Sequence, residues 1–284
     1  PMRGTLHFVA AEDVRWMIKL LAPRAIARSL RRQEQLNINH ASLARSNKLV
    51  IEALEGGNQL TRKALLQILD DAQIPTANQR GYHILWRLAE DGVICLAPRE
   101  GKQQTFALLD EWVPTTLEFS RDEALATLAR RYFSSHGPAT LQDFVWWSGL
   151  STVDAKAGLQ LVNSGLLHEN IKNRTYWWSE NEIEVHLGLK SAFLLPAFDE
   201  YLVGYKDRSA ALSTKHAGYV KSLLTPTIIL EGQVVGTWKR SMTKDAAIIA
   251  PTFFSPLTTA ERQACGVAAT QYADFYNKAV KFES

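Results

Sequence analysis

The chain has 284 residues, 46% of them hydrophobic, and a formal net charge of +3. This size and composition are typical of a folded protein of two or three domains and exclude a disordered tail. No apolar run reaches the roughly 20 residues that a membrane span needs, and no secretory signal is visible, so we expect no membrane segment. The cysteines, Cys95 and Cys265, lie in separate apolar stretches, which favours buried free thiols and a reducing cytoplasm.

Residues 1–39 form the first predicted region. They begin with Pro1 and continue into a strand-like stretch, Met2–Val9. A lone strand needs a neighbour for its backbone hydrogen bonds, so we expect the natural chain to be longer at its N-terminus. Ala10–Leu21 has helical periodicity, and Pro23 follows it, which predicts a helix that ends there.

Residues 40–114 contain three helical stretches followed by two short apolar runs. The expected elements are helices at His40–Leu54, Thr61–Ala72 and Thr76–Asp91, and strands at Val93–Ala97 and Thr105–Leu109. Two helices joined by a tight turn and followed by a hairpin are typical of a winged helix-turn-helix unit. Gly92 is placed to end the third helix in the left-handed conformation.

Residues 115–184 repeat this pattern. The expected elements are helices at Asp122–Ser134, through Trp146–Ser148 and at Ser151–Asn163, then a hairpin through Leu166–His168 and Thr175–Trp178. Ser120 and Glu123 have the spacing of a capping box, and Gly165 occupies the position that Gly92 has in the first copy. Tandem units of this kind suit duplex DNA, because the second helix of each can enter the major groove.

Residues 185–284 do not repeat the pattern of helices and hairpin. An apolar and aromatic stretch covers Phe193–Tyr205, and the expected elements after it are strands at Thr227–Leu230, Val234–Lys239 and Ala246–Ala250 and a helix from Thr258 to about Lys281. This pattern predicts a β-rich unit with a terminal helix, and an α+β fold for the whole chain.

Side chains that suit nucleic acid gather on the two predicted hairpins and on the third helix of the first copy. Arg, Lys and Gln hold phosphates or read base edges. The candidates are Gln79, Arg80, His83 and Arg87 on the helix, Arg99 and Lys102 on the first hairpin, and Lys172 and Arg174 on the second. An ordinary amphipathic helix with a solvated face, or a protein-binding module, fits the same pattern.

Basic residues also outnumber acidic ones between Lys206 and Asp245, where Lys239 and Arg240 are adjacent. Such a cluster neutralises phosphates or forms a solvated face. The aromatic pairs Trp146–Trp147 and Trp177–Trp178 favour core packing over base stacking.

Enzyme signatures are missing from the sequence. There is no phosphate-binding loop, no dinucleotide-binding glycine pattern, no serine-hydrolase elbow and no HExxH motif, and no histidine has zinc-ligand spacing to a cysteine. We therefore expect no metal and no cofactor.

Three stretches resemble the winged helix DNA-binding family of the AlkZ and YcaQ type: Pro1–His7 with Ala11–Asp13, Gly101–Pro114, and Leu194–Arg208. The resemblance covers essentially the whole chain, and the third stretch is its most specific part. It implies tandem winged helix-turn-helix units followed by a C-terminal β-barrel-like unit with a terminal helix. It also implies double-stranded DNA as partner and hydrolysis of the N-glycosidic bond of alkylated or crosslinked purines, without a metal or nucleotide cofactor.

The family's catalytic signature is a Gln-apolar-Gln or Gln-apolar-Asp triplet, which the resemblance places before Pro1. Gln33–Gln35 has a charged centre and is expected at the surface, so it does not take this role and the catalytic residues stay unknown. Polar groups embedded in the third stretch are candidates for DNA contact: Asp199, Tyr205, Lys206 and Arg208. A structural ion pair of Asp207 with a nearby basic residue is the alternative for this segment.

We therefore expect a duplex DNA-binding relative of DNA-repair glycosylases, monomeric, cytoplasmic and associated with the nucleoid. The alternatives are a non-enzymatic winged-helix regulator and a protein-interaction scaffold.

Overall fold

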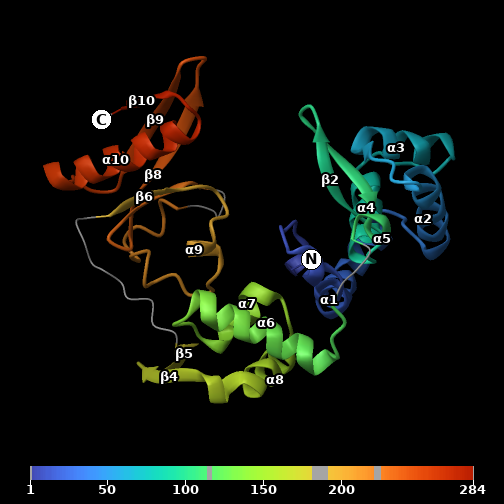
Figure 1. The fold of residues 1–284 in the computed structure, drawn as a ribbon, viewed down its shortest axis with the longest axis horizontal. Helices are drawn as coiled ribbons and strands as arrows, with labels where there is room; N and C mark the ends of the chain where they lie inside the picture. Colours follow the sequence, from blue (N-terminus) through green and yellow to red (C-terminus); the bar gives the residue numbers. More distant parts are fainter. Residues whose placement is uncertain (1, 114–116, 181–190, 221–224, 284) are drawn as a thin grey trace. The chain divides into compact units, whose positions relative to one another are not determined.

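The computed structural model describes residues 2–113, 117–180, 191–220 and 225–283 (Figure 1). The chain divides into two compact units: unit 1 consists of Pro1–Tyr132 and Ser148–Gly165, and unit 2 of Phe133–Trp147 and Leu166–Ser284. Each unit has a hydrophobic cluster of its own. The division into four domains at residues 39, 114 and 184 stays a prediction.

The strand expected at Met2–Val9 was wrong. Met2–Gly4 forms a short 3-10 helix, η1, in which Arg3 and Gly4 have φ values of 55° and 72°. The N–H of Thr5 donates to the carbonyl of Met2 at 3.0 Å and closes this turn. The chain then continues without strand pairing among the described residues, and Phe8 is fully exposed. An extended segment without a pairing edge does not form a strand.

The first long helix, α1, covers Val14–Gln35 after the 3-10 turn η2 at Ala11–Asp13. It contains Pro23, so the helix end predicted there was wrong. A proline inside a helix costs about 3 kcal/mol. Burial of apolar side chains before it offsets this cost, since Trp16, Met17, Leu20 and Leu21 all pack inside unit 1.

The elements predicted for residues 40–114 are confirmed in type and order. They are helices α2 (His40–Leu54), α3 (Arg62–Asp71) and α4 (Arg80–Glu90), and strands β1 (Leu60–Thr61), β2 (Ile94–Glu100) and β3 (Gln103–Leu108). The strands form an antiparallel sheet in the order β1-β3-β2. The helices pack on it through one cluster that includes Leu54, Leu65, Leu69, Ile84 and Ile94. A short helix, α5 (Leu109–Trp112), follows the sheet.

The elements predicted for the second repeat are also present. They are helices α6 (Arg121–His136), α7 (Leu141–Ser148) and α8 (Thr152–Val162), and the hairpin of β4 (Leu166–Ile171) and β5 (Arg174–Ser179). The capping box before α6 is confirmed: the N–H of Ser120 donates to Glu123 at 2.8 Å, and the N–H of Glu123 donates to the Ser120 hydroxyl at 3.3 Å. The boundary between the units falls within this repeat, so a second winged helix stays a prediction.

The two glycines expected at equivalent helix ends differ. Gly92 has a φ of 76° and follows α4 in the left-handed conformation, as predicted. Gly165 lies in a 3-10 turn, η3 (Asn163–Gly165), and is not among the glycines with positive φ. That prediction was wrong, because η3 extends α8 as a tighter turn that leads directly into β4.

Unit 2 contains a five-stranded sheet in the order β10-β9-β8-β7-β6. Its strands are β6 (Ala192–Leu195), β7 (Thr227–Leu230), β8 (Gln233–Met242), β9 (Ala246–Phe253) and β10 (Ala279–Phe282). Neighbouring strands are antiparallel except β10, which pairs parallel to β9. The prediction of a β-rich unit and of an α+β chain is confirmed.

The last helix, α10, covers Thr259–Phe275 and packs on this sheet through Cys265 and Ala269. Thr258 caps it in a capping box with Glu261, as its sequence position predicts. The expected extension of the helix to Lys281 was wrong. The chain turns at Asn277, with a φ of 52°, and β10 then places Val280 and Phe282 against the same cluster.

Both cysteines are free thiols, as predicted. Cys95 is half-buried, and burial raises the pKa of its thiol to about 11. Cys265 is fully buried, and burial raises its pKa as well.

Candidate nucleic-acid interface

The N-terminus of α4 is held to the end of α1 by Arg80. Its guanidinium donates to the carbonyl of Pro75 at 2.9 Å, to that of Asn37 at 2.9 Å, and to that of Leu36. Carbonyls at a helix end have no partner within the helix, so Arg80 satisfies acceptors that α1 leaves open. Gln79 precedes it at the N-cap position, where its side-chain oxygen accepts from Arg32 at 2.8 Å.

Farther along α4, Arg87 is engaged within the protein. It pairs with Asp91 at 2.9 Å and donates to the side-chain oxygen of Gln33 at 3.5 Å. Gln33 is only 4% exposed and donates to Ser29 at 2.8 Å, so its expected place at the surface was wrong. The Gln33 amide bonds with Ser29 of α1 and Arg87 of α4, where these helices are in contact, whereas Glu34 and Gln35 are exposed as expected.

His83 is half-buried on the same helix. Burial, and then the positive charge of Arg32, lower the pKa of its imidazole. Its buried Nδ1 atom has no hydrogen-bond partner among the described residues. Nearly all buried polar atoms in proteins are paired, so this imidazole nitrogen is an exception within the described part of the chain.

The β2–β3 hairpin carries its cations at the tip. Arg99 and Lys102 are exposed on either side of the turn at Gly101, whose φ is 59°. Figure 1 shows this hairpin extending past α4 in unit 1. Exposed cations on a projecting hairpin are suited to phosphate contact, because they neutralise phosphate at little desolvation cost.

The β4–β5 hairpin turns at Lys172 and Asn173, with φ values of 49° and 63°. Lys172 is exposed, whereas the Arg174 guanidinium pairs with the carboxylate of Asp207. The pKa of Asp207 falls to about 2, because Ser209 donates to its carboxylate and Arg174 lies beside it. The expected structural ion pair of Asp207 is therefore confirmed.

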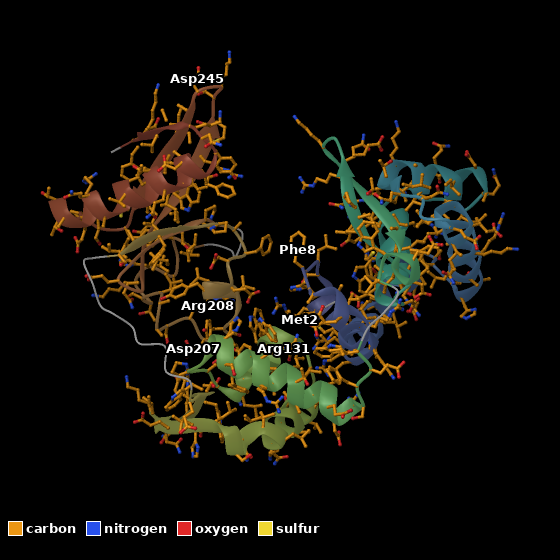
Figure 2. All side chains as sticks on the ribbon, viewed as in Figure 1. Met2, Phe8, Arg131, Asp207, Arg208 and Asp245 are labelled. Atoms are coloured by element: carbon orange, nitrogen blue, oxygen red, sulfur yellow. The ribbon has the colours of Figure 1, made fainter. Side chains whose placement is uncertain are left out.

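Most polar groups of the stretch that ends at Arg208 form hydrogen bonds within the protein. Asp207 and Arg208, at the end of this stretch, are labelled in Figure 2. Asp199 caps the short helix α9 (Glu200–Val203) by accepting from the N–H of Tyr201 at 2.9 Å. The hydroxyl of Tyr205 donates to the carbonyl of His136 at 2.9 Å, and burial, followed by the charge of Asp143, raises its pKa to about 12.

Arg208 donates from Nε to the carbonyl of Leu202 at 2.7 Å, and its guanidinium lies 5.7 Å from the ring centroid of Trp146. Burial lowers its pKa. Lys206 differs from its neighbours, because its backbone is held by Asp143 while its side chain is exposed. Within this stretch Lys206 is thus the candidate whose charge faces solvent.

The sequence analysis missed Asp143. It is 3% exposed, and its carboxylate accepts from the N–H of Lys206 at 2.9 Å and from that of Asp207 at 3.2 Å. It also accepts from the N–H and the hydroxyl of Thr140 at 3.0 and 2.7 Å. The Thr-x-x-Asp spacing at the start of α7 is a capping signal that was visible in the sequence.

On β8, Lys239 and Arg240 are exposed. The Arg240 guanidinium donates to the hydroxyl of Tyr272, and it lies 5.7 and 6.0 Å from the ring centroids of Tyr272 and Tyr276. This arrangement is a cation–π contact that leaves part of the guanidinium open to solvent.

The tryptophan pairs lie in unit 2 but are not in its buried core: Trp146 is 38% exposed and Trp147 is half-buried, so the expected core packing holds only in part. Trp146 donates to the carbonyl of Val203 at 2.9 Å, and Trp147 donates to Glu200 at 3.1 Å. Trp177 stacks on His168 at a centroid distance of 4.6 Å, and both Trp177 and Trp178 are half-buried.

Within the described ranges no group of three or more His, Cys, Asp or Glu side chains is arranged to hold a metal ion. In the same part of the chain no helix has the length and apolar character of a membrane span.

The arrangement of helices and sheets defines an α+β protein with the fold of a solved DNA glycosylase. The structure of Streptomyces sahachiroi DNA glycosylase AlkZ superposes with a TM-score of 0.78 at 21% identity, covering 99% of this chain and 80% of that one. A sequence model described as DNA glycosylase AlkZ-like matches residues 1–275, and the chain belongs to this family. A curated protein of Streptomyces sahachiroi, an interstrand DNA cross-link repair glycosylase, is 26% identical over 301 residues, which is 94% of this chain and 76% of that protein.

Proposed function

We propose that this protein binds duplex DNA and acts in DNA repair, on the N-glycosidic bond of alkylated or crosslinked purines. The observation that supports this most is the family match along residues 1–275. The name of the similar Streptomyces sahachiroi protein, which is given as a cross-link repair glycosylase, supports the substrate class.

The proposed DNA-binding elements are α3, α4 and the β2–β3 hairpin as one winged helix, and α7, α8 and the β4–β5 hairpin as a second. We assign phosphate contact to exposed cations of the two hairpins, of the loop after α9 and of β8: Arg99, Lys102, Lys172, Lys206 and Lys239. Gln79, His83, Arg87 and Arg240 are secondary contacts, since each also touches a protein group or is half-buried. Arg80, Arg174, Asp199, Tyr205 and Arg208 support these elements through their internal bonds.

The proposed chemistry needs few protein groups. An alkylated purine with a positive charge is already a good leaving group, so a polar side chain has only to position water beside the oxocarbenium-like sugar. The residue with this role stays unassigned. Gln33–Gln35 is a poor candidate, because the Gln33 amide is buried and bonded to Ser29 and Arg87.

Salt-dependent binding tests the DNA-binding part of the proposal. Each phosphate contact contributes about −0.9 to the slope of log K against log salt concentration on B-form DNA. We expect Lys102→Gln to weaken duplex binding and to reduce the magnitude of this slope by about 0.9. Lys48→Gln is the control, since Lys48 is also an exposed lysine of unit 1, on α2, and pairs with Glu52. Equal slopes for wild type and Lys102→Gln would remove the β2–β3 hairpin from the interface.

A further inference from the structure

The turn between β6 and α9 holds a phenylalanine in an unusual backbone conformation. Phe198 has a φ of 61°, in the left-handed region that glycine, asparagine and aspartate occupy most readily. The other non-glycine residues with a positive φ in the described ranges all carry polar side chains. A bulky side chain in this region strains the backbone, because its Cβ crowds the following carbonyl oxygen. Glycine would therefore suit the turn better than the residue that is present.

Packing of the Phe198 ring does not account for this strain. The residue is 61% exposed, and it is in neither of the clusters of described residues that form around Ile228 and Ile229 of β7. An exposed aromatic ring contributes little of the free energy that its burial would provide. Backbone strain that the fold does not need is typical of functional positions. The conformation and the exposure together indicate a ring that acts on a partner.

The turn is fixed on its β6 side. The pairing of β6 with β7 continues as far as Leu195, which lies opposite Thr227. The carbonyl of Leu195 also accepts from Nε1 of Trp238 at 2.9 Å, and Trp238 is only 5% exposed. The start of the turn therefore cannot shift without breaking contacts of the sheet.

The turn is also fixed on its α9 side, where Asp199 caps the helix. The hydroxyl of Tyr201 donates to the carbonyl of Gly232 at 2.7 Å, and Nε1 of Trp147 donates to the carboxylate of Glu200 at 3.1 Å. The exposed ring is thus carried by a turn with both ends held. A side chain presented in this way loses little conformational entropy when it meets a partner.

We propose that Phe198 inserts its ring into a DNA duplex at a gap in the base stack, an inference that rests on the proposed function. Apolar side chains that enter a duplex act as wedges between base steps, and an aromatic ring can stack on the bases beside it. The neighbouring carboxylates of Asp199 and Glu200 disfavour contact with phosphate, which leaves the bases as partner. Lys206, farther along the same stretch, is exposed and provides charge for a phosphate.

Fluorescence anisotropy with two duplexes tests the insertion. One duplex is fully paired, and the other contains one tetrahydrofuran abasic analogue, which leaves a gap in the stack. A ring that enters the paired duplex has to unstack a base step, whereas the gap is already open. We expect the wild-type protein to bind the abasic duplex about tenfold more tightly than the paired one, since stacking on one base contributes on this order. Equal affinity for the two duplexes would overturn the proposal.

Variants assign this preference to the ring. Phe198→Gly should reduce the ratio of the two affinities to about one and leave the affinity for the paired duplex unchanged, because only stacking is lost. Phe198→Trp should keep the preference, since it retains a stacking ring. Phe193→Ala is the matched control, because Phe193 of β6 is 56% exposed in the same unit. A preference that survives in Phe198→Gly, or that falls equally in Phe193→Ala, would contradict the assignment.

Thermal unfolding separates insertion from a structural role of the ring. Glycine relieves the left-handed strain, so Phe198→Gly should unfold at the temperature of the wild type or above it. A ring that served the fold would give the opposite result. A lower melting temperature in Phe198→Gly would therefore refute the argument from strain and the proposal with it.

The same titrations distinguish failure of the insertion from failure of the proposed function. If the wild-type protein binds neither duplex with a salt-dependent affinity, the proposed DNA binding and the insertion are both wrong. If Lys102→Gln weakens binding of both duplexes alike and Phe198→Gly changes neither affinity, the proposed function stands and the insertion alone is removed.

Discussion

The carboxylate of Asp143 accepts the backbone N–H of Lys206 at 2.9 Å, across 63 positions of sequence. The same carboxylate bonds the first turn of α7 through Thr140. Asp143 thus fixes the loop after α9 to α7, and it does so through the backbone, which leaves the Lys206 side chain exposed.

Replacing this carboxylate by an amide should destabilise the protein. In Asp143→Asn, the amide NH2 faces one of the N–H donors that Asp143 now accepts, and a buried donor left without an acceptor costs about 1–3 kcal/mol. Urea unfolding of wild type and variant measures this free energy. Asp245→Asn, which alters an exposed carboxylate of the same unit, should unfold like the wild type. An unchanged midpoint for Asp143→Asn would show that the four hydrogen bonds contribute little.

Arg208 and Lys206 should separate stability from DNA affinity. Arg208→Ala removes the bond to Leu202 and the contact over Trp146, so we expect a lower melting temperature with intact duplex affinity. Lys206→Ala should lower duplex affinity and leave the melting temperature unchanged, because the exposed Lys206 side chain supplies a charge for phosphate contact. Thermal unfolding and fluorescence anisotropy on the same samples provide both readouts. Loss of affinity in Arg208→Ala at an unchanged melting temperature would place its guanidinium on DNA instead.

Stability should depend on pH through Asp207. Its pKa is lowered from 3.8 to about 2 in the folded protein, so its contribution is complete above pH 3.8 and is lost as the pH falls through about 2. Melting temperatures measured across this window should therefore differ between wild type and Asp207→Asn at the upper end and converge at the lower end. Asp245→Asn provides the baseline for an exposed carboxylate. A constant difference at every pH would mean that the Arg174–Asp207 pair does not depend on the charge of the carboxylate.

Base excision tests the enzymatic part of the proposal on this chain. The family's catalytic triplet, Gln-apolar-Gln or Gln-apolar-Asp, is not found in residues 1–284. The carboxylate of Asp199 accepts a hydrogen bond as the cap of α9. If the proposed activity resides in these 284 residues, the chain should release N7-alkylguanine from a duplex faster than spontaneous depurination. Release at the spontaneous rate would contradict the enzymatic part of the proposal for this chain. Cleavage of abasic sites followed by electrophoresis measures the release. Excision that is lost in Asp199→Asn would identify Asp199 as the catalytic carboxylate.

Local signals in the sequence predicted the elements well where caps and periodicity agree. The helix α2 was predicted with its observed bounds, His40–Leu54. In the structure Asn39 caps its start, and Gly56, with a φ of 82°, follows its end. The four-residue strand β10 had no such local signal. It forms because it pairs parallel to β9, and this pairing depends on where β9 lies and not on the residue pattern of β10.

The roles of individual cations were harder to predict than the elements that carry them. Arg80 and Arg208 suited DNA by residue type, yet both donate to backbone carbonyls, those of Asn37 and Leu202. A carbonyl acceptor is present at every residue, so no sequence pattern indicates which carbonyl a guanidinium will meet. Lys102 and Lys206 are exposed, as expected of lysines, and their contact with DNA stays a prediction.

The parallel pairing of β10 with β9 makes the end of the chain a structural part of unit 2. Val280 and Phe282 pack against the same cluster as Trp238, and their strand covers the outer edge of β9. Shortening the protein before Ala279 would uncover a row of N–H and C=O groups next to freshly exposed apolar surface. The sheet would then end on the eight-residue β9 instead of the four-residue β10, and a longer edge beside exposed apolar surface pairs more readily with other molecules. The short edge strand β10 therefore limits self-association.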